Sequence, residues 1–200
     1  MKKIALFLLF ILVYCSIYSQ EKQYDSGVSN LEAFSNRKGT FILQESKYLG
    51  YFSDVTGRLD FTCEVLTDLK TNEKEGGITL TIYSDNPTLK AFTGGVLVRT
   101  KYYIDYEEIE ALSSFFTYFK DNLYKTEPAV FTSVKFISTE STEYAFTFNP
   151  ATSKKTWLFK VSPYPYTNEF TYFLKKETVD NLLNLLNQSK EIIIEKTNQK

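Results

Sequence analysis

The residue types available for catalysis are few, because the 200-residue chain contains no histidine and only two cysteines, Cys15 and Cys63. The absence of histidine removes the commonest general base, the Ser-His-Asp and Cys-His nucleophile systems, and the commonest zinc ligand. Two thiols are also too few for a structural zinc or iron–sulfur site. Cys63 lies on the apolar side of the alternating segment 59–65, which predicts a buried and unreactive thiol.

Carboxylates form two local groups in the sequence. Asp105, Glu107, Glu108 and Glu110 stand at the beginning of a predicted helix, where negative charge is favourable without any catalytic or metal-binding role. The segment 54–60 combines acidic residues, threonine and glycine in a turn that resembles a calcium loop only vaguely, and we predict a plain hairpin there. A hydrolase that uses paired carboxylates is kept as an alternative function.

Aromatic side chains are the better candidates for contact with a ligand. Tyr164 and Tyr166 flank Pro165 in a stiff segment, and Trp157 precedes them closely in the sequence. Rigid, amphipathic rings of this kind suit recognition, so these three aromatic residues form the predicted binding site, with a protein or a carbohydrate as its partner. The alternative is that both tyrosines fold back over a sheet edge while the prolines block edge pairing. No metal or cofactor is predicted.

The charge balance disfavours nucleic acid as a partner. Lysine and arginine total 23 against 24 aspartate and glutamate residues. The basic residues are scattered along the chain, so no polybasic footprint for nucleic acid or for a membrane surface emerges.

Most of the chain alternates between apolar and polar side chains, as half-buried strands do. Turn-forming residues separate these segments, which favours antiparallel pairing. The leader is expected to hold at most a short strand near 28–34. The eight main predicted strands are 40–52, 59–66, 77–83, 96–104, 129–138, 142–148, 154–161 and 169–174.

Two segments follow helical spacing instead. The first helix is predicted over 106–123, with Asp105 as its N-cap and Glu108 as the capping-box partner. The second is predicted over 178–188, followed by a tail that includes 192–194. The apolar stripe of the first helix comprises Ile109, Leu112, Phe116, Phe119 and Leu123.

The order of elements indicates an α+β fold with antiparallel sheets and two amphipathic helices, built as two tandem β4-α halves. An offset of seventy residues aligns Tyr102 with Tyr172 at the strand-to-helix junctions, and also Phe61 with Phe131. A true duplication would give each half a sheet with its own helix laid across one face. Chance similarity between two such junctions is the alternative. The outline resembles that of the β-lactamase inhibitory proteins, whose helices come first in each half; no motif matches and no family is assigned.

The first residues have the layout of a secretory signal peptide. Lys2 and Lys3 precede an apolar core over 4–14 that is too short to span a bilayer, and cleavage is predicted after Ser19. Lipidation at Cys15 is disfavoured because the bulky Tyr14 precedes it. Cleavage would leave Cys63 as the single thiol, so no intrachain disulfide is expected. The predicted organisation is therefore a signal peptide over 1–19, a flexible leader over 20–37, and halves over 38–124 and 125–200 that form one compact unit.

These patterns predict a bacterial protein that works in the periplasm or outside the cell, as a non-enzymatic binding or envelope-associated module of unknown partner. Two alternatives stay open. One is a carrier of a small apolar ligand between sheet and helices, which would show as an apolar cavity. The other is the carboxylate-based hydrolase.

Overall fold

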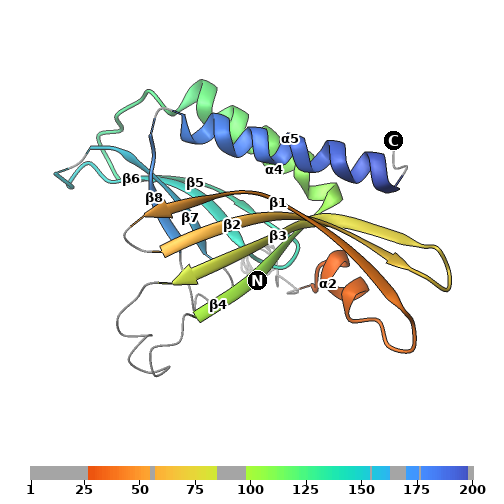
Figure 1. The fold of residues 1–200 in the computed structure, drawn as a ribbon. Helices are drawn as coiled ribbons and strands as arrows, with labels where there is room; N and C mark the ends of the chain where they lie inside the picture. The colour runs from red at the N-terminus through yellow and green to blue at the C-terminus, as the bar shows by residue number, and fades with distance from the viewer. Residues whose placement is uncertain are drawn as a thin grey trace, which may run out of the picture.

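The computed structural model describes residues 27–54, 57–84, 98–153, 155–162, 170–175 and 177–197. Two four-stranded antiparallel sheets lie beneath a pair of long helices (Figure 1), which confirms the predicted α+β class. Sheet A is formed in sequence order by β1 (Ile42–Asp54), β2 (Gly57–Asp68), β3 (Lys74–Ser84) and β4 (Val98–Asp105). Sheet B is formed by β5 (Thr132–Ile137), β6 (Glu143–Phe148), β7 (Trp157–Ser162) and β8 (Phe170–Phe173). The helices are α2 (Asn30–Ser35), α4 (Tyr106–Asn122) and α5 (Thr178–Thr197).

The strands form where the apolar alternation predicts them, and each strand end lies within three residues of its predicted position. In β3, Ile78, Leu80 and Ile82 all point into the core and are almost completely buried. Because successive strand residues face opposite sides, this alternation fixes which face of sheet A meets the helices.

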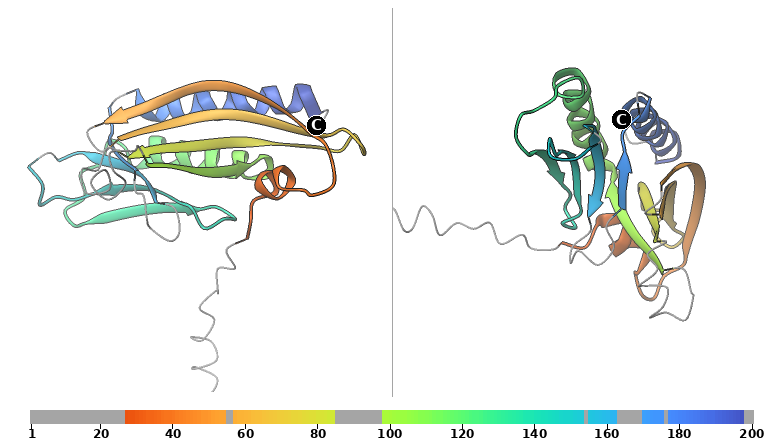
Figure 2. Two further views of the ribbon diagram at one scale, coloured as in Figure 1. Left: turned by 60° about the horizontal axis from the view of Figure 1, so that its bottom comes forward. Right: turned by 90° about the vertical axis from the view of Figure 1, so that its left-hand side faces the viewer.

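Helix α5 follows sheet B in the chain, but it packs on sheet A (Figure 2, right). Ile193 lies directly over Gly76 of β3, where an added Cβ would be 2.6 Å from the Ile193 Cγ2 atom. The thiol of Cys63 in β2 donates a hydrogen bond to the Ser189 carbonyl oxygen at 3.8 Å. Aliphatic side chains therefore make most of this interface, and a glycine allows the close approach of the helix.

Helix α4 follows sheet A, but its aromatic residues pack on sheet B. The ring of Phe119 stacks on Phe146 of β6 with 3.7 Å between centroids, and it meets Trp157 of β7 edge-on at 5.0 Å. Phe116 contacts Phe146 and Phe159 at centroid distances of 5.6 and 5.7 Å. Such aromatic pairs add stabilisation beyond the area they bury.

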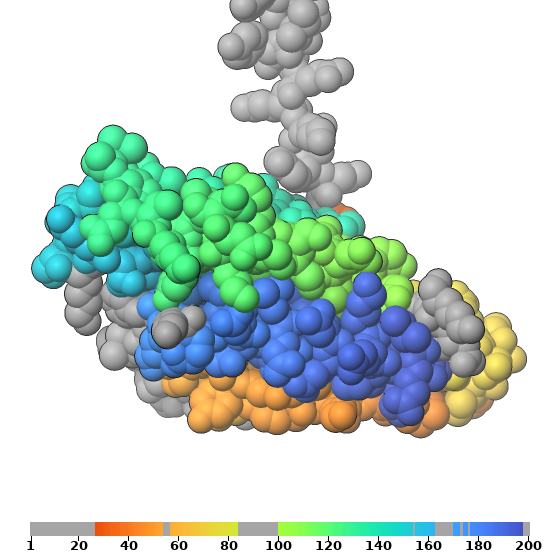
Figure 3. All heavy atoms as spheres, turned by 90° about the horizontal axis from the view of Figure 1, so that it is seen from above, coloured from red at the N-terminus to blue at the C-terminus, as the bar shows by residue number. Residues whose placement is uncertain are grey.

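The two helices run antiparallel beside each other across the top of the molecule (Figure 3). Lys120 pairs with Asp180 at 2.6 Å, and Glu110 pairs with Lys190 at 2.9 Å. These ion pairs are exposed and screened by water, so they contribute little to stability. The apolar contacts beneath the helices therefore supply most of the energy that holds them.

The exchange of helices corrects the expectation that each helix covers the sheet of its own half. Both sheets and both helices contribute to one continuous cluster of buried side chains. Phe52 of β1 illustrates this continuity, because its ring meets Phe61 of β2 at 5.8 Å and Tyr172 of β8 at 5.6 Å. Each half thus depends on the other for the helix that buries its sheet.

The amino-terminal segment also differs from the sequence prediction. A helix, α2, replaces the short strand expected near 28–34, and it packs on the face of sheet A opposite α5 (Figure 1). Ser29 caps this helix by accepting a hydrogen bond from the Glu32 amide at 3.0 Å. Leu31 and Phe34 are buried against Leu66, so this part of the predicted leader is packed on the sheet.

Two further details depart from the predicted pattern. Helix α5 continues nine residues beyond the predicted end at 188, and Ile193 in this extension is fully buried. The proposed match of Phe61 with Phe131 fails, because Phe61 is buried in β2 whereas Phe131 is exposed ahead of β5. The match of Tyr102 with Tyr172 holds, since both are buried in the strand that leads to a helix.

We expect Phe119→Ala to lower the free energy of unfolding by about 3–5 kcal/mol, because it leaves a cavity between α4 and sheet B. The matched control is Tyr118→Ala on the same helix, where the side chain is 57% exposed and the change should stay within about 0.5 kcal/mol. Urea unfolding followed by circular dichroism measures both. Equal losses in the two variants would contradict the packing of α4 on sheet B.

Candidate functional site

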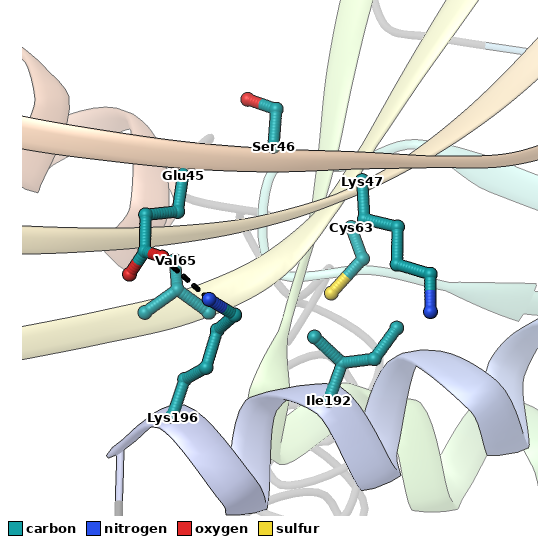
Figure 4. A pocket seen from close by; sticks show the side chains of 7 residues that line it. All are labelled: Glu45, Ser46, Lys47, Cys63, Val65, Ile192 and Lys196. Atoms are coloured by element: carbon teal, nitrogen blue, oxygen red, sulfur yellow. Dashed lines mark hydrogen bonds and ion pairs between the residues drawn. The ribbon is translucent and has the colours of Figure 1, made fainter.

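A crevice of about 390 Å³ lies between α5 and strands β1 and β2 of sheet A. Figure 4 shows the side chains of β1 and β2 extending toward the helix, whereas Ser46 points away from it. The floor of the crevice is apolar, because Cys63, Val65 and Ile192 form it. The described lining residues are Glu45, Ser46, Lys47, Cys63, Val65, Ile192 and Lys196.

The position of the crevice follows from how α5 sits on the sheet. Over β3, the helix approaches the backbone closely because Gly76 has no side chain. Over β1, the residues on the same face are Glu45 and Lys47, whose long charged side chains cannot be buried without partners. Near its carboxyl end the helix therefore lies close to β3 and leaves space over residues 45–47 of β1.

Charged groups line this space from both elements. Lys196 of α5 pairs with Glu45 of β1 at 2.5 Å, and this carboxylate raises the pKa of the lysine. The ammonium group of Lys47 extends into the crevice beside Ile192 (Figure 4). Within the described residues no ion-pair partner of Lys47 is found. The crevice therefore combines an apolar floor with one surplus positive charge.

Cys63 forms part of the floor, and it is only 1% exposed. Burial raises the pKa of its thiol to about 11. The thiolate is the reactive form of cysteine, so this side chain is inert near neutral pH. The predicted burial of this thiol is confirmed.

The predicted aromatic site is not brought together by the described structure. Tyr164 and Tyr166 lie outside the described residues. Trp157 is only 2% exposed, packs against Phe119 and Phe148, and donates its indole N–H to the Thr126 carbonyl oxygen at 3.1 Å. Trp157 is therefore a core residue of sheet B and offers no ring surface to a ligand.

The acidic residues at the start of α4 have a structural role, as predicted. Asp105 is the N-cap and Glu108 completes the capping box. The Asp105 carboxylate also accepts hydrogen bonds from the amides of Asn30 and Leu31 at 2.8 and 3.0 Å, so it fixes the first turn of α2. Glu108 in turn accepts two hydrogen bonds from Thr139, at 2.6 and 2.8 Å. These carboxylates join α2, α4 and the β5–β6 turn.

The carboxylate of Glu140 also links the β5–β6 turn to β4, a contact that no sequence pattern indicates. Its carboxylate accepts a hydrogen bond from the Tyr103 amide on β4, across the boundary between the two sheets. Burial raises the pKa of Glu140 to about 7, and the nearby carboxylates of Glu32, Asp105 and Glu108 add to the rise against the opposing effect of the hydrogen bond.

The segment 54–60 is part of a plain hairpin, as predicted, because Asp54 pairs with Gly57 in the β1–β2 ladder. Asp60 is held by the Arg58 guanidinium through two of its nitrogen atoms. Across the described parts of the chain, no group of three or more cysteine, aspartate or glutamate side chains is placed to bind a metal ion.

The crevice residues were missed by the sequence analysis, although a signal for them exists. Glu45 and Lys47 occupy the face of β1 that also carries Leu43 and Leu49, so they interrupt an apolar face. Lys196 lies beyond the predicted end of the second helix at 188, so the sequence prediction does not place it on α5. A charged pair on the inward face of a strand is the feature that could have indicated a site.

Comparison with known proteins gives no functional assignment: neither a scan against models of protein families nor a search of curated proteins finds a match to this sequence. None of the described helices is both long and apolar enough to cross a membrane.

We expect Glu140→Gln to stabilise the protein relative to the wild type above neutral pH. The folded-state pKa of Glu140 is about 7 against an ordinary 4.5, so its contribution to stability is present below pH 4.5 and is lost as the pH rises through 7. Glutamine keeps an oxygen acceptor for the Tyr103 amide and carries no charge.

Urea unfolding at about pH 4 and about pH 8 measures this difference. The control, Glu191→Gln on the exposed face of α5, should follow the wild type at both values. A Glu140→Gln variant with the same pH dependence as the wild type would contradict the assignment.

Proposed function

We propose that this protein is an exported, non-enzymatic binding protein whose crevice beneath α5 takes a small amphipathic anion. The observation that carries the proposal is the combination of an apolar floor, formed by Cys63, Val65 and Ile192, with the ammonium group of Lys47. An anionic group of the ligand would pair with Lys47, and its apolar part would lie against the floor.

The dimensions of the crevice are compatible with this occupant. Small-molecule sites in proteins typically enclose about 300–1,000 Å³ and place a few polar groups on a mainly apolar lining. The crevice, at about 390 Å³, lies at the lower end of that range. It suits a ligand with a single ring system or a short chain and one acidic group.

The charged rim favours an amphipathic ligand over the wholly apolar one considered from the sequence. A purely apolar molecule would desolvate Lys47 without offering its ammonium group a hydrogen-bond acceptor, which carries a cost. An anion compensates for that cost through charge-assisted hydrogen bonds.

Binding is also better supported than hydrolysis. Hydrolysis of a glycosidic bond by paired carboxylates uses two such groups that flank the scissile bond. Among the described lining residues, Glu45 carries the only carboxylate, and it is paired with Lys196. The other clustered carboxylates hold helix ends and turns together.

The exported location rests on the signal-peptide pattern over 1–19. Amino-terminal sequencing of the protein recovered from its producing cell tests this part. A chain that begins at Gln20 and is found outside the cytoplasm is the expected result. An intact amino terminus in the cytosolic fraction would contradict export without bearing on the crevice.

Fluorescence titration with 8-anilinonaphthalene-1-sulfonate tests the site, because this probe is itself an amphipathic anion that brightens in apolar surroundings. The mature chain should bind about one probe molecule saturably. Lys47→Glu should weaken binding by at least about tenfold, which corresponds to about 1.4 kcal/mol, because it reverses the charge that faces the sulfonate.

The matched control is Lys101→Glu, which makes the same change on an exposed residue of β4 whose neighbour in the ladder, Thr81, faces away from the core. This control should bind the probe as the wild type does. Equal weakening in both variants, or fluorescence that never saturates, would contradict a defined site at Lys47.

A further inference from the structure

Strand β1 forms an open edge of sheet A. It pairs with β2 and with no other described strand, and it lies along the margin of the molecule in both the ribbon and the space-filling views (Figures 2 and 3). Its residues 43–48 are exposed, with Leu43 at 47% and Tyr48 at 51%. An exposed edge strand of this length is a template for pairing with another strand.

The hydrogen-bonding groups that β1 presents outward can be identified. The Phe41 carbonyl oxygen accepts a hydrogen bond from the Leu69 amide of the β2 side at 2.8 Å. In an antiparallel ladder the N–H and C=O of one residue point to the same side, and the side alternates along the strand. The amides and carbonyls of Gln44, Ser46 and Tyr48 therefore point away from β2.

The sequence of this edge is complementary to itself around Ser46. When two copies of the segment 43–49 are aligned antiparallel with Ser46 opposite Ser46, Glu45 of each copy faces Lys47 of the other. At the ends of the segment, Leu43 of each copy faces Leu49 of the other. Opposite charges and apolar pairs directly across from each other stabilise a ladder.

The hydrogen-bond geometry agrees with this alignment. Ser46 presents its backbone groups outward, so a two-fold axis at Ser46 makes Ser46–Ser46 and Gln44–Tyr48 hydrogen-bonded pairs. The Glu45–Lys47 pairs then occupy the positions without backbone hydrogen bonds, where opposite side chains are closest. Charge and backbone register thus select the same arrangement.

The structure also limits how far the pairing extends. The ladder between β1 and β2 shifts register between Tyr48 and Gly50, and beyond this bulge Phe52 packs against Tyr172 of β8. Bulges commonly end edge pairing. The available edge is therefore short and is used once by each copy, which gives a closed two-fold assembly.

We propose that the chain forms a homodimer in which β1 of one copy pairs antiparallel with β1 of a second copy, centred on Ser46, to give a continuous eight-stranded sheet. The interface is small, so association is in the range of transient complexes. This inference does not rest on the proposed ligand, although Glu45 and Lys47 serve both surfaces.

Charge reversal within β1 tests the dimer directly. The wild-type mature chain at about 100 μM should show dimer by sedimentation velocity. Glu45→Lys places lysine opposite Lys47, and Lys47→Glu places glutamate opposite Glu45, so each variant alone should be monomeric at this concentration. The mixture of the two variants should form a heterodimer, because both charge pairs are then complementary.

A second variant tests the backbone register. Ser46→Pro removes an outward N–H without taking a hydrogen bond from β2, as proline does on free strand edges. It should keep the circular dichroism spectrum of the wild type while losing the dimer. A monomeric wild type at this concentration, dimers in both single-charge variants, or a mixture that stays monomeric would overturn the proposal.

Discussion

The exchange of the two helices is the constraint on which the rest of the structure depends. The aromatic stripe of α4 requires a partner surface rich in large rings, and sheet B provides it through Phe146, Trp157 and Phe159. The aliphatic stripe of α5 fits the aliphatic face of sheet A, where Gly76 lets Ile193 approach the backbone. Each sheet would expose its apolar face without the helix contributed by the other half, so the two halves form a single core.

The packing of α5 on sheet A also places the candidate crevice beside the exposed edge of β1. Helix α5 is seated over β3, and it leaves a crevice over β1 and β2 where Glu45, Lys47 and Lys196 meet. Strand β1 is at once the wall of the crevice and the free edge of sheet A. In the proposed function, the residues that interrupt the apolar face of this strand serve recognition rather than core packing. Binding of a ligand and pairing with a second copy are expected on adjacent surfaces.

Sequence patterns predict the elements well because alternation and helical spacing are local properties. The strands, the start of α4 and the capping role of Asp105 could be predicted in this way. Which helix covers which sheet is a long-range property, yet the clustering of phenylalanine in α4 and in sheet B was a readable signal for it. The burial of Trp157 could not be inferred from its position near Tyr164, because neighbours in sequence need not share a surface. The elevated pKa of Glu140 comes first from burial and then from carboxylates distant in sequence, and no local pattern indicates either cause.

The exchange of helices is tested most directly by urea unfolding of the mature chain with two intrinsic probes. Trp157 fluorescence reports on sheet B beneath α4, and the reactivity of the Cys63 thiol reports on sheet A beneath α5. Because neither sheet keeps its covering helix when the other half unfolds, both probes should change at the same urea concentration. Two separate midpoints, with one sheet protected while the other is exposed, would contradict a single interdependent core.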